Sequence, residues 1–239
     1  MRPLKFGKKE TNKIHIKMAN KNIEQEPQMN VAAAVSKTEK FLNENKKTLI
    51  WILCAVVALV AVGLIYQHAY SIPRAKEAVN QAFTAEMYFG EGEFEKALNG
   101  DENAMGLAEV IKEYGSKAPE AVYFEAGVCE LQLGNWDDAI AYLNKYNGKD
   151  PIMSARAIAC KGDAYSAKED YKKAAGLYMQ AAQAADNVFA AAYLLKAGIV
   201  YEKLGENDKA VEAYNTIKVK YPQSVEAYDI NKYIERISK

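Results

Sequence analysis

The sequence predicts an all-α protein in which one transmembrane helix precedes a solenoid of stacked helical hairpins. Three observations lead to this fold class. An uncharged apolar run lies near residue 50, the rest of the chain is rich in alanine with only six prolines, and its C-terminal half repeats at about 35 residues. Basic and acidic residues balance at 31 each, so the informative feature is where they lie.

Residues 1–46 form a basic leader that we expect to be cytoplasmic and largely flexible. Residues 1–48 carry eleven Lys and Arg against five Glu, whereas the body that follows is mildly acidic. A basic flank before an apolar segment is retained in the cytoplasm. A weak amphipathic helix is expected at residues 31–45, and translation can begin at Met1 or at Met18. The body lacks a dense basic face, so we expect no nucleic-acid partner.

Residues 47–70 are expected to form a transmembrane signal-anchor helix. Residues 49–66 contain no charge and nearly span the hydrocarbon of a bilayer, while Lys46 and Lys47 flank them. A cleaved signal peptide has a shorter apolar run behind a shorter leader, and a buried core helix is the other alternative. The positive-inside rule then keeps the leader in the cytoplasm and exports the body, which in a bacterium means an inner-membrane anchor and a periplasmic body.

Three aligned stretches within residues 119–222 carry small residues and one large residue at matching places. The glycines are Gly127, Gly162 and Gly198; the alanines are Ala139, Ala174 and Ala210; the large residues are Leu143, Tyr178 and Tyr214. We expect each unit to be two amphipathic helices that cross at the glycine and the alanine. The large residue is expected to lie beneath the next hairpin, and no unit buries its apolar face without stacking.

Turn residues and prolines mark the helix ends of these units. Gly134 and Gly205 can adopt the left-handed conformation that ends a helix. Pro151 and Pro222 are expected to stop the second helix of the first and third units.

The flanking segments read as two caps of the solenoid. Residues 71–118 are interpreted as an irregular first repeat, with a helix over residues 73–90 and a break in the helical pattern near Gly100. A further helix is expected from about Asn103 to Tyr114. Residues 223–239 are expected to form a C-terminal capping helix that faces solvent.

The aligned pattern resembles the tetratricopeptide repeat (TPR) family from about Pro119 to the C-terminus. The second unit departs from the pattern at Lys161, Glu169 and Asp186, where an apolar residue, a glycine and a proline are usual. The resemblance implies a module that binds protein partners. Fold alone does not identify the partner.

The layout of the whole chain resembles the YfgM-like family, which also has a basic N-terminus, one span, a degenerate first repeat and about three TPR units. Residues 95–140 resemble that family most. This implies an ancillary subunit of the Sec translocon, or a periplasmic chaperone partner that binds exported polypeptides. The alternative is a structural scaffold for cell-envelope assembly that binds no client.

The TPR resemblance also implies a concave groove lined by the first helix of each unit. The positions singled out are Phe124, Val128, Leu131, Gln132, Arg156, Asp163, Leu195, Ile199 and Lys203. Such an apolar groove would accept a hydrophobic peptide or an amphipathic helix. Alternatively, neighbouring repeats or the C-terminal helix cover it. The Lys/Asn set of the carboxylate-clamp subtype is missing.

The sequence gives no sign of catalysis, and we expect no enzyme activity, cofactor, metal or small-molecule substrate. The body has no histidine beyond His68, which adjoins the membrane segment, and no GxSxG, P-loop or GxGxxG motif. Carboxylate pairs such as Asp137 and Asp138 sit at helix starts, where they offset the helix dipole. Cys129 and Cys160 are either bridged or two small buried side chains.

Overall fold

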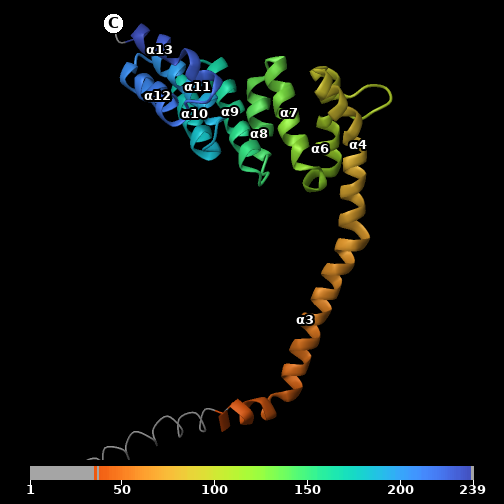
Figure 1. The fold of residues 1–239 in the computed structure, drawn as a ribbon. Coiled ribbons are helices and arrows are strands. Elements are labelled where there is room, and N and C mark those ends of the chain that lie inside the picture. The colour runs from red at the N-terminus through yellow and green to blue at the C-terminus, as the bar shows by residue number, and fades with distance from the viewer. Residues whose placement is uncertain (1–34, 37, 238–239) are drawn as a thin grey trace, which may run out of the picture. The chain divides into compact units, whose positions relative to one another are not determined.

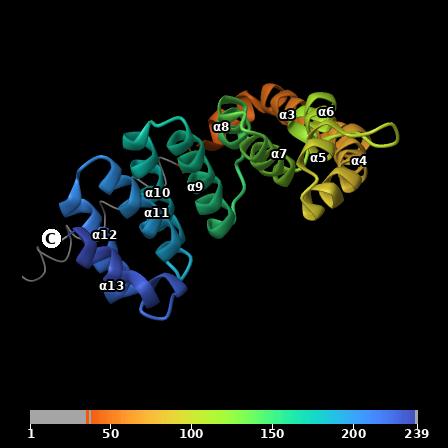
Figure 2. The ribbon, with the colours of Figure 1, turned by 90° about the horizontal axis from the view of Figure 1, so that it is seen from above.

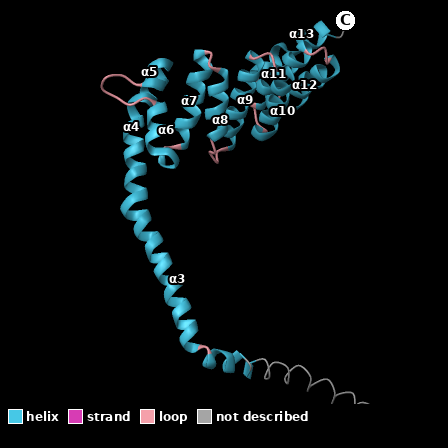
Figure 3. Cartoon of the chain, turned by 180° about the vertical axis from the view of Figure 1, so that it is seen from behind, coloured by secondary structure: helices cyan, strands magenta, loops and turns pink. Residues whose placement is uncertain are grey.

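The computed structural model describes residues 35–36 and 38–237, and within these ranges it contains helices and turns but no strand. Figure 3 shows this all-helical composition, which confirms the all-α part of the predicted fold class. Residues 38–44 are helical, whereas residues 1–34, with most of the predicted leader, lie outside the described part. The chain divides into two units, Met1–Tyr66 and Gln67–Lys239, each described by itself.

Helix α3 (Lys46–Tyr66) is 21 residues long and has no buried residue. Its large apolar side chains are exposed, with Trp51 at 76% and Leu59 at 73%. The helix is long and apolar enough to cross a membrane. The sequence-based span of residues 47–70 is shared between α3 and the short π-helix η1 (Gln67–Ser71).

The segment that follows forms a short first hairpin and a third helix, which together we call the cap repeat. It comprises α4 (Ile72–Glu91), α5 (Phe94–Asn99), α6 (Leu107–Tyr114) and the 3-10 turn η2 (Gly115–Lys117). Helix α6 begins four residues later than the predicted Asn103. The Asp101 carboxylate accepts the backbone N–H groups of Asn103 and Ala104 and holds them in a turn.

Three helical hairpins follow the cap repeat and lie side by side (Figures 1 and 2). Hairpin 1 is α7 (Glu120–Leu133) and α8 (Trp136–Lys145), hairpin 2 is α9 (Pro151–Ala167) and α10 (Tyr171–Ala185), and hairpin 3 is α11 (Ala190–Lys203) and α12 (Asn207–Lys220). Helix α13 (Val225–Ile237) packs on hairpin 3 through Ile230, which is 1% exposed. Most of its other side chains face solvent, as expected.

The glycines lie at the helix crossings, where the large residue of the same hairpin covers each of them. A Cβ on Gly162 would come 2.7 Å from a ring carbon of Tyr178, and one on Gly198 would come 2.2 Å from the ring of Tyr214. Each ring therefore covers the glycine of its own hairpin. The prediction that the large residues also lie against the next hairpin is confirmed, because Tyr178 shares a core cluster with Val200 of α11 and Leu143 shares one with Ala157 of α9.

A left-handed residue lies seven positions after the crossing residue in each hairpin. Gly134 has a φ of 84° and Gly205 a φ of 73°, as predicted for helix-ending glycines. Glu169 takes a φ of 61° in hairpin 2 without being glycine. Hairpin 2 thus keeps the turn despite its departure from the sequence pattern. Pro151 does not stop α8 but is the first residue of α9, where a missing N–H costs nothing.

Candidate protein-binding surface

The first helices of the three hairpins, α7, α9 and α11, carry the residues that sequence analysis assigned to a groove. Their orientation is fixed at the crossings, because Ala139, Ala174 and Ala210 on the second helices are all fully buried. The residue after each crossing glycine is Val128, Asp163 or Ile199, and each of these is half-buried. The three first helices therefore place equivalent residues at equivalent positions along the stack.

In hairpin 1 the predicted groove residues are mostly part of the packing. Phe124 is 4% exposed, and its ring packs against Tyr146 at 5.8 Å between centroids. The Arg156 guanidinium lies over the other side of the ring, 5.8 Å from its centroid. Val128 packs against the same cluster. Phe124 is consequently not presented to a partner.

Leu131 and Gln132 lie at the end of α7, where Leu131 is half-buried and Gln132 is exposed. Leu195 is half-buried against the core of hairpin 3, and Ile199 is also half-buried. The structure therefore does not gather these residues into one open apolar surface.

The charged residues of the predicted groove are engaged with neighbours. Lys196 Nζ on α11 binds Asp163 at 2.7 Å, and Tyr178 Oη donates to the same carboxylate oxygen at 2.7 Å. Lys203 Nζ lies 4.7 Å from the centroid of the Tyr171 ring. Each of these charged residues therefore has a protein neighbour.

The tyrosine, carboxylate and cation arrangement recurs at the next repeat boundary. Tyr214 Oη donates to Glu202 at 2.5 Å, and Arg236 on α13 binds both oxygens of that carboxylate at 2.7 and 2.9 Å. Burial and the carboxylate both raise the pKa of the tyrosine hydroxyl in each set, so it remains a donor. At each of these two boundaries, a cation on the following helix thus binds a carboxylate of the preceding hairpin.

Sequence analysis missed these sets because their members come from different repeats. The available signal was Tyr178 and Tyr214 at one repeat position, each with a carboxylate on its own first helix. The cations, Lys196 and Arg236, could not be assigned without the stacking geometry.

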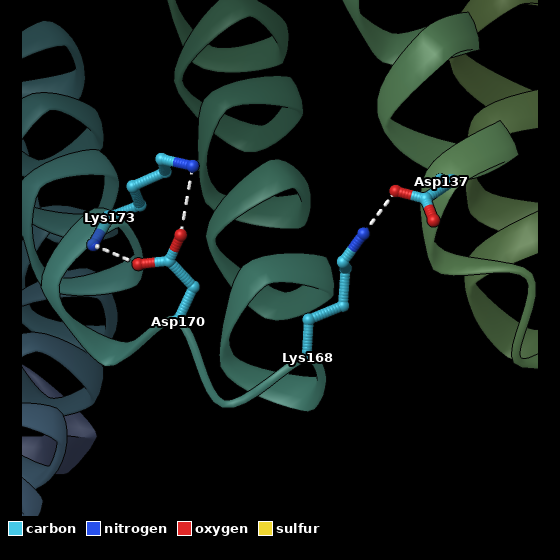
Figure 4. Close-up of polar contacts among 4 residues, drawn as sticks. All are labelled: Asp137, Lys168, Asp170 and Lys173. Atoms are coloured by element: carbon cyan, nitrogen blue, oxygen red, sulfur yellow. Dashed lines mark hydrogen bonds and ion pairs between the residues drawn. The ribbon is translucent and has the colours of Figure 1, made fainter.

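Polar contacts also join hairpins 1 and 2 at their turns, as Figure 4 shows. Lys168, at the end of α9, pairs with Asp137 in the first turn of α8. Asp170 caps α10 by accepting the Lys173 N–H at 3.3 Å and pairs with the Lys173 Nζ at 2.9 Å. Asp137 is 84% exposed, so its ion pair contributes little to stability.

The cap repeat exposes an apolar row that sequence analysis did not single out. Val79, Phe83 and Met87 follow each other at four-residue spacing on α4 and are 52%, 61% and 50% exposed. A neighbouring face of the helix packs Ala78, Ala82 and Ala85 into the first core cluster. A second apolar row beside the buried one was the available signal.

A separate cavity of about 310 Å³ lies between α10 and α12. Its lining combines apolar residues such as Met179 and Leu194 with Lys209, Glu212 and Lys220. Helix α11 also contributes to the lining through Leu194 and Tyr201, but none of the predicted groove residues lines the cavity.

The two cysteines of hairpins 1 and 2 are free thiols. Cys129 belongs to the core cluster of the cap repeat, and Cys160 packs beside Phe124 and Leu143. Burial raises the pKa of Cys129 to about 12 and that of Cys160 to about 11. Both thiols are therefore protonated at neutral pH, and the reading as two small buried side chains holds in this structure.

Comparison with known families identifies the class of these hairpins. Tetratricopeptide repeat models match residues 107–151 and residues 192–224. The body therefore contains tetratricopeptide repeats, which act as protein–protein interaction modules. Hairpin 2 lies between the two matches, where the sequence departs from the pattern although the hairpin geometry is kept.

Two solved structures of MamA resemble the chain. One, titled as the MamA protein, is 24% identical with a TM-score of 0.50, over 67% of this chain and 86% of that one. The other is 24% identical with a TM-score of 0.47, over 64% and 92%. The first likeness supports the fold alone. None of the curated proteins compared with the chain matches it.

Proposed function

We propose that the protein is anchored in a bacterial inner membrane by α3, with its N-terminus in the cytoplasm and its TPR body in the periplasm. The observation that carries this proposal is that the 21-residue helix α3, which has no charge from Thr48 to Tyr66, has no buried residue and directly precedes the body in the chain. In water that surface would be costly, whereas lipid accommodates it and α3 satisfies its own backbone. The basic leader supports the orientation.

The proposed role is that of an ancillary subunit at the membrane, which binds protein partners without catalysis and without a cofactor or nucleic acid. The TPR hairpins support partner binding, and the resemblance to the YfgM-like family suggests the Sec translocon or a periplasmic chaperone. Among the described residues, no group of three His, Cys, Asp or Glu is placed to hold a metal ion. The proposals of no catalysis and no cofactor rest also on the sequence, which lacks catalytic motifs.

One observation favours a second candidate, the scaffold for envelope assembly without client binding. Phe124, at a groove position, is 4% exposed, and Asp163, at another, is held in an ion pair. A surface of this kind suits one folded partner with complementary polar groups better than a range of hydrophobic segments. The apolar row on α4 is the more open surface for such a partner.

Site-specific photo-crosslinking in membranes separates the two candidates. Crosslinkers at Gln132 and Lys203 would probe the first helices of the hairpins, and one at Ala58 would probe the span. Lys172, exposed on α10, serves as a matched control. Translocon subunits at Ala58 with varied exported chains at Gln132 and Lys203 would support the ancillary subunit. One fixed envelope protein at those positions, with no translocon product, would leave the scaffold.

A further inference from the structure

We call the boundary between two successive first helices a joint. Each joint pairs one position from each helix. On the earlier helix it is the residue directly after the small residue at the crossing, and on the later helix it is the residue two places before the crossing glycine. From the C-terminal joint backwards, the pairs are Asp163 with Lys196, Val128 with Cys160, and Glu86 with Glu125. The first pair is an ion pair, and the second lies in one apolar cluster. The third, between α4 and α7, has a carboxyl group at both positions.

Glu125 is half-buried, and none of the ion pairs among the described residues involves its carboxyl group. Its Oε2 atom is the buried side-chain oxygen that has no hydrogen-bond partner among the described residues. Burial, followed by repulsion from Glu86, raises the pKa of Glu125 to about 7. On the same helix, Cys129 is buried and stays protonated.

Cations of the cap repeat do not compensate this carboxyl. Lys96 of α5 pairs with Glu93 at 3.0 Å, and Arg74 of α4 pairs with Glu113 of α6 at 2.7 Å. The group that faces Glu125 from the helices packed against it is therefore Glu86, which carries the same charge.

We propose that the carboxyl pair of Glu86 and Glu125 makes the joint between the cap repeat and hairpin 1 sensitive to protons. While Glu125 is protonated, the joint holds one negative charge and is closed. When Glu125 loses its proton, a second negative charge stands in an enclosed place opposite the first, and the joint loosens. The cap repeat precedes the three hairpins in the chain, so this joint controls how firmly they are held to it.

The direction of the pH dependence follows from linkage. The pKa of Glu125 is raised in the folded chain above its ordinary value of 4.5. The closed joint therefore has its full stability below about pH 4.5 and loses stability as the pH rises through about 7. The joint between hairpins 2 and 3 lacks this dependence, because Lys196 compensates Asp163.

Amide hydrogen exchange of the full chain in lipid nanodiscs, measured from about pH 5.5 to 8.5 and corrected for intrinsic rates, tests the proposal. We expect exchange in α4 and α7 to accelerate about tenfold across this range, below a linkage ceiling of about 30-fold. Exchange in α9 and α11 should change little, which provides an internal control.

Three variants test whether Glu125 is the group whose titration causes the pH dependence. Glu125→Gln keeps the shape without the titration and should remove the pH dependence of α4 and α7. Glu86→Gln should weaken the dependence and move its midpoint to lower pH, since it removes the repulsion but not the burial. Glu109→Gln, exposed on α6, should behave as the unchanged chain. Equal pH dependence in α4 and α11, or an unaltered dependence in Glu125→Gln, would overturn the proposal.

Discussion

The joint between hairpins 1 and 2 and the joint between hairpins 2 and 3 have the same backbone register but different chemistry. Val128 and Cys160 meet in an apolar cluster with Leu143 at the first joint. At the second joint the corresponding places hold Asp163, Lys196 and Tyr178 in a hydrogen-bonded ion pair. Small residues at the crossings set the hairpin geometry, so the residues at the joint are free to differ.

This comparison teaches that stacking does not require one kind of contact. An apolar joint is stabilised by burial and is insensitive to salt. A joint closed by an ion pair depends on each member being present, because a partner left alone loses its compensation.

The largest expected effect is at the glycine crossing of hairpin 3, which orients α11 at the second joint. Gly198→Ala places a Cβ 2.2 Å from the Tyr214 ring, and that ring is held by Glu202. We expect a loss of about 3 kcal/mol in the free energy of unfolding, measured by urea titration of the full chain in detergent.

Two further glycines calibrate that result. Gly127→Ala should cost less, because the nearest atoms belong to the flexible Leu143 side chain. Gly176→Ala on α10 meets nothing within 4 Å and should stabilise by up to about 1 kcal/mol. Equal losses at all three positions would show that the crossing geometry is not what the glycines provide.

Removing the shared acceptor of the second joint is expected to have the next largest effect. Asp163→Ala leaves the buried Tyr178 hydroxyl and Lys196 without their carboxylate, at a cost of about 2 kcal/mol. Val128→Ala at the apolar joint should cost about 1 kcal/mol from lost burial, with no change in salt dependence. A smaller loss for Asp163→Ala than for Val128→Ala would contradict the proposed role of the ion pair.

A double-mutant cycle between Asp163 and Lys196 measures the coupling energy of the ion pair, which is expected to be smaller than the losses above. The side chains are 30% and 45% exposed, so the coupling energy should be about 0.5 kcal/mol and should fall at high salt. The measurement is urea unfolding of the four chains of the cycle at low and high salt. A coupling that does not change with salt would mean that packing, not charge, joins the two residues.

The smallest expected effect is on thiol reactivity. In a Cys54→Ala background, both remaining thiols should label slowly at pH 8, since burial keeps them protonated. Cys160, which is less buried than Cys129, should label first. Rapid labelling of Cys129 in the folded chain would show that the core cluster around it opens more readily than the packing implies.

The fold could be predicted from the sequence because its determinants are local and periodic. The glycine and alanine positions predicted the hairpins, and the apolar run predicted a helix with the length and composition of a span. The start of α6 was misplaced because Asp101 turns the chain by accepting two backbone N–H groups, which helical periodicity does not reveal.

The candidate surface was less predictable because exposure depends on neighbours from other repeats. Phe124 holds a groove position in the family pattern, but Tyr146 and Arg156 cover its ring. Likewise, Glu125 reads as an ordinary helical acid until α4 brings Glu86 against it. Such pairings require the stacking register, which the sequence supplies only in part.

Transplanting the apolar joint into the second joint tests the account most directly. The triple variant Asp163→Val, Lys196→Cys, Tyr178→Leu copies the residues of the joint between hairpins 1 and 2. Its free energy of unfolding is measured beside that of Asp163→Val alone, in reductant and at two salt concentrations. We predict that the triple variant lies within about 1.5 kcal/mol of the unchanged chain, is more stable than the single variant, and loses the salt dependence. A triple variant less stable than Asp163→Val alone would contradict the claim that one backbone register accepts either kind of joint.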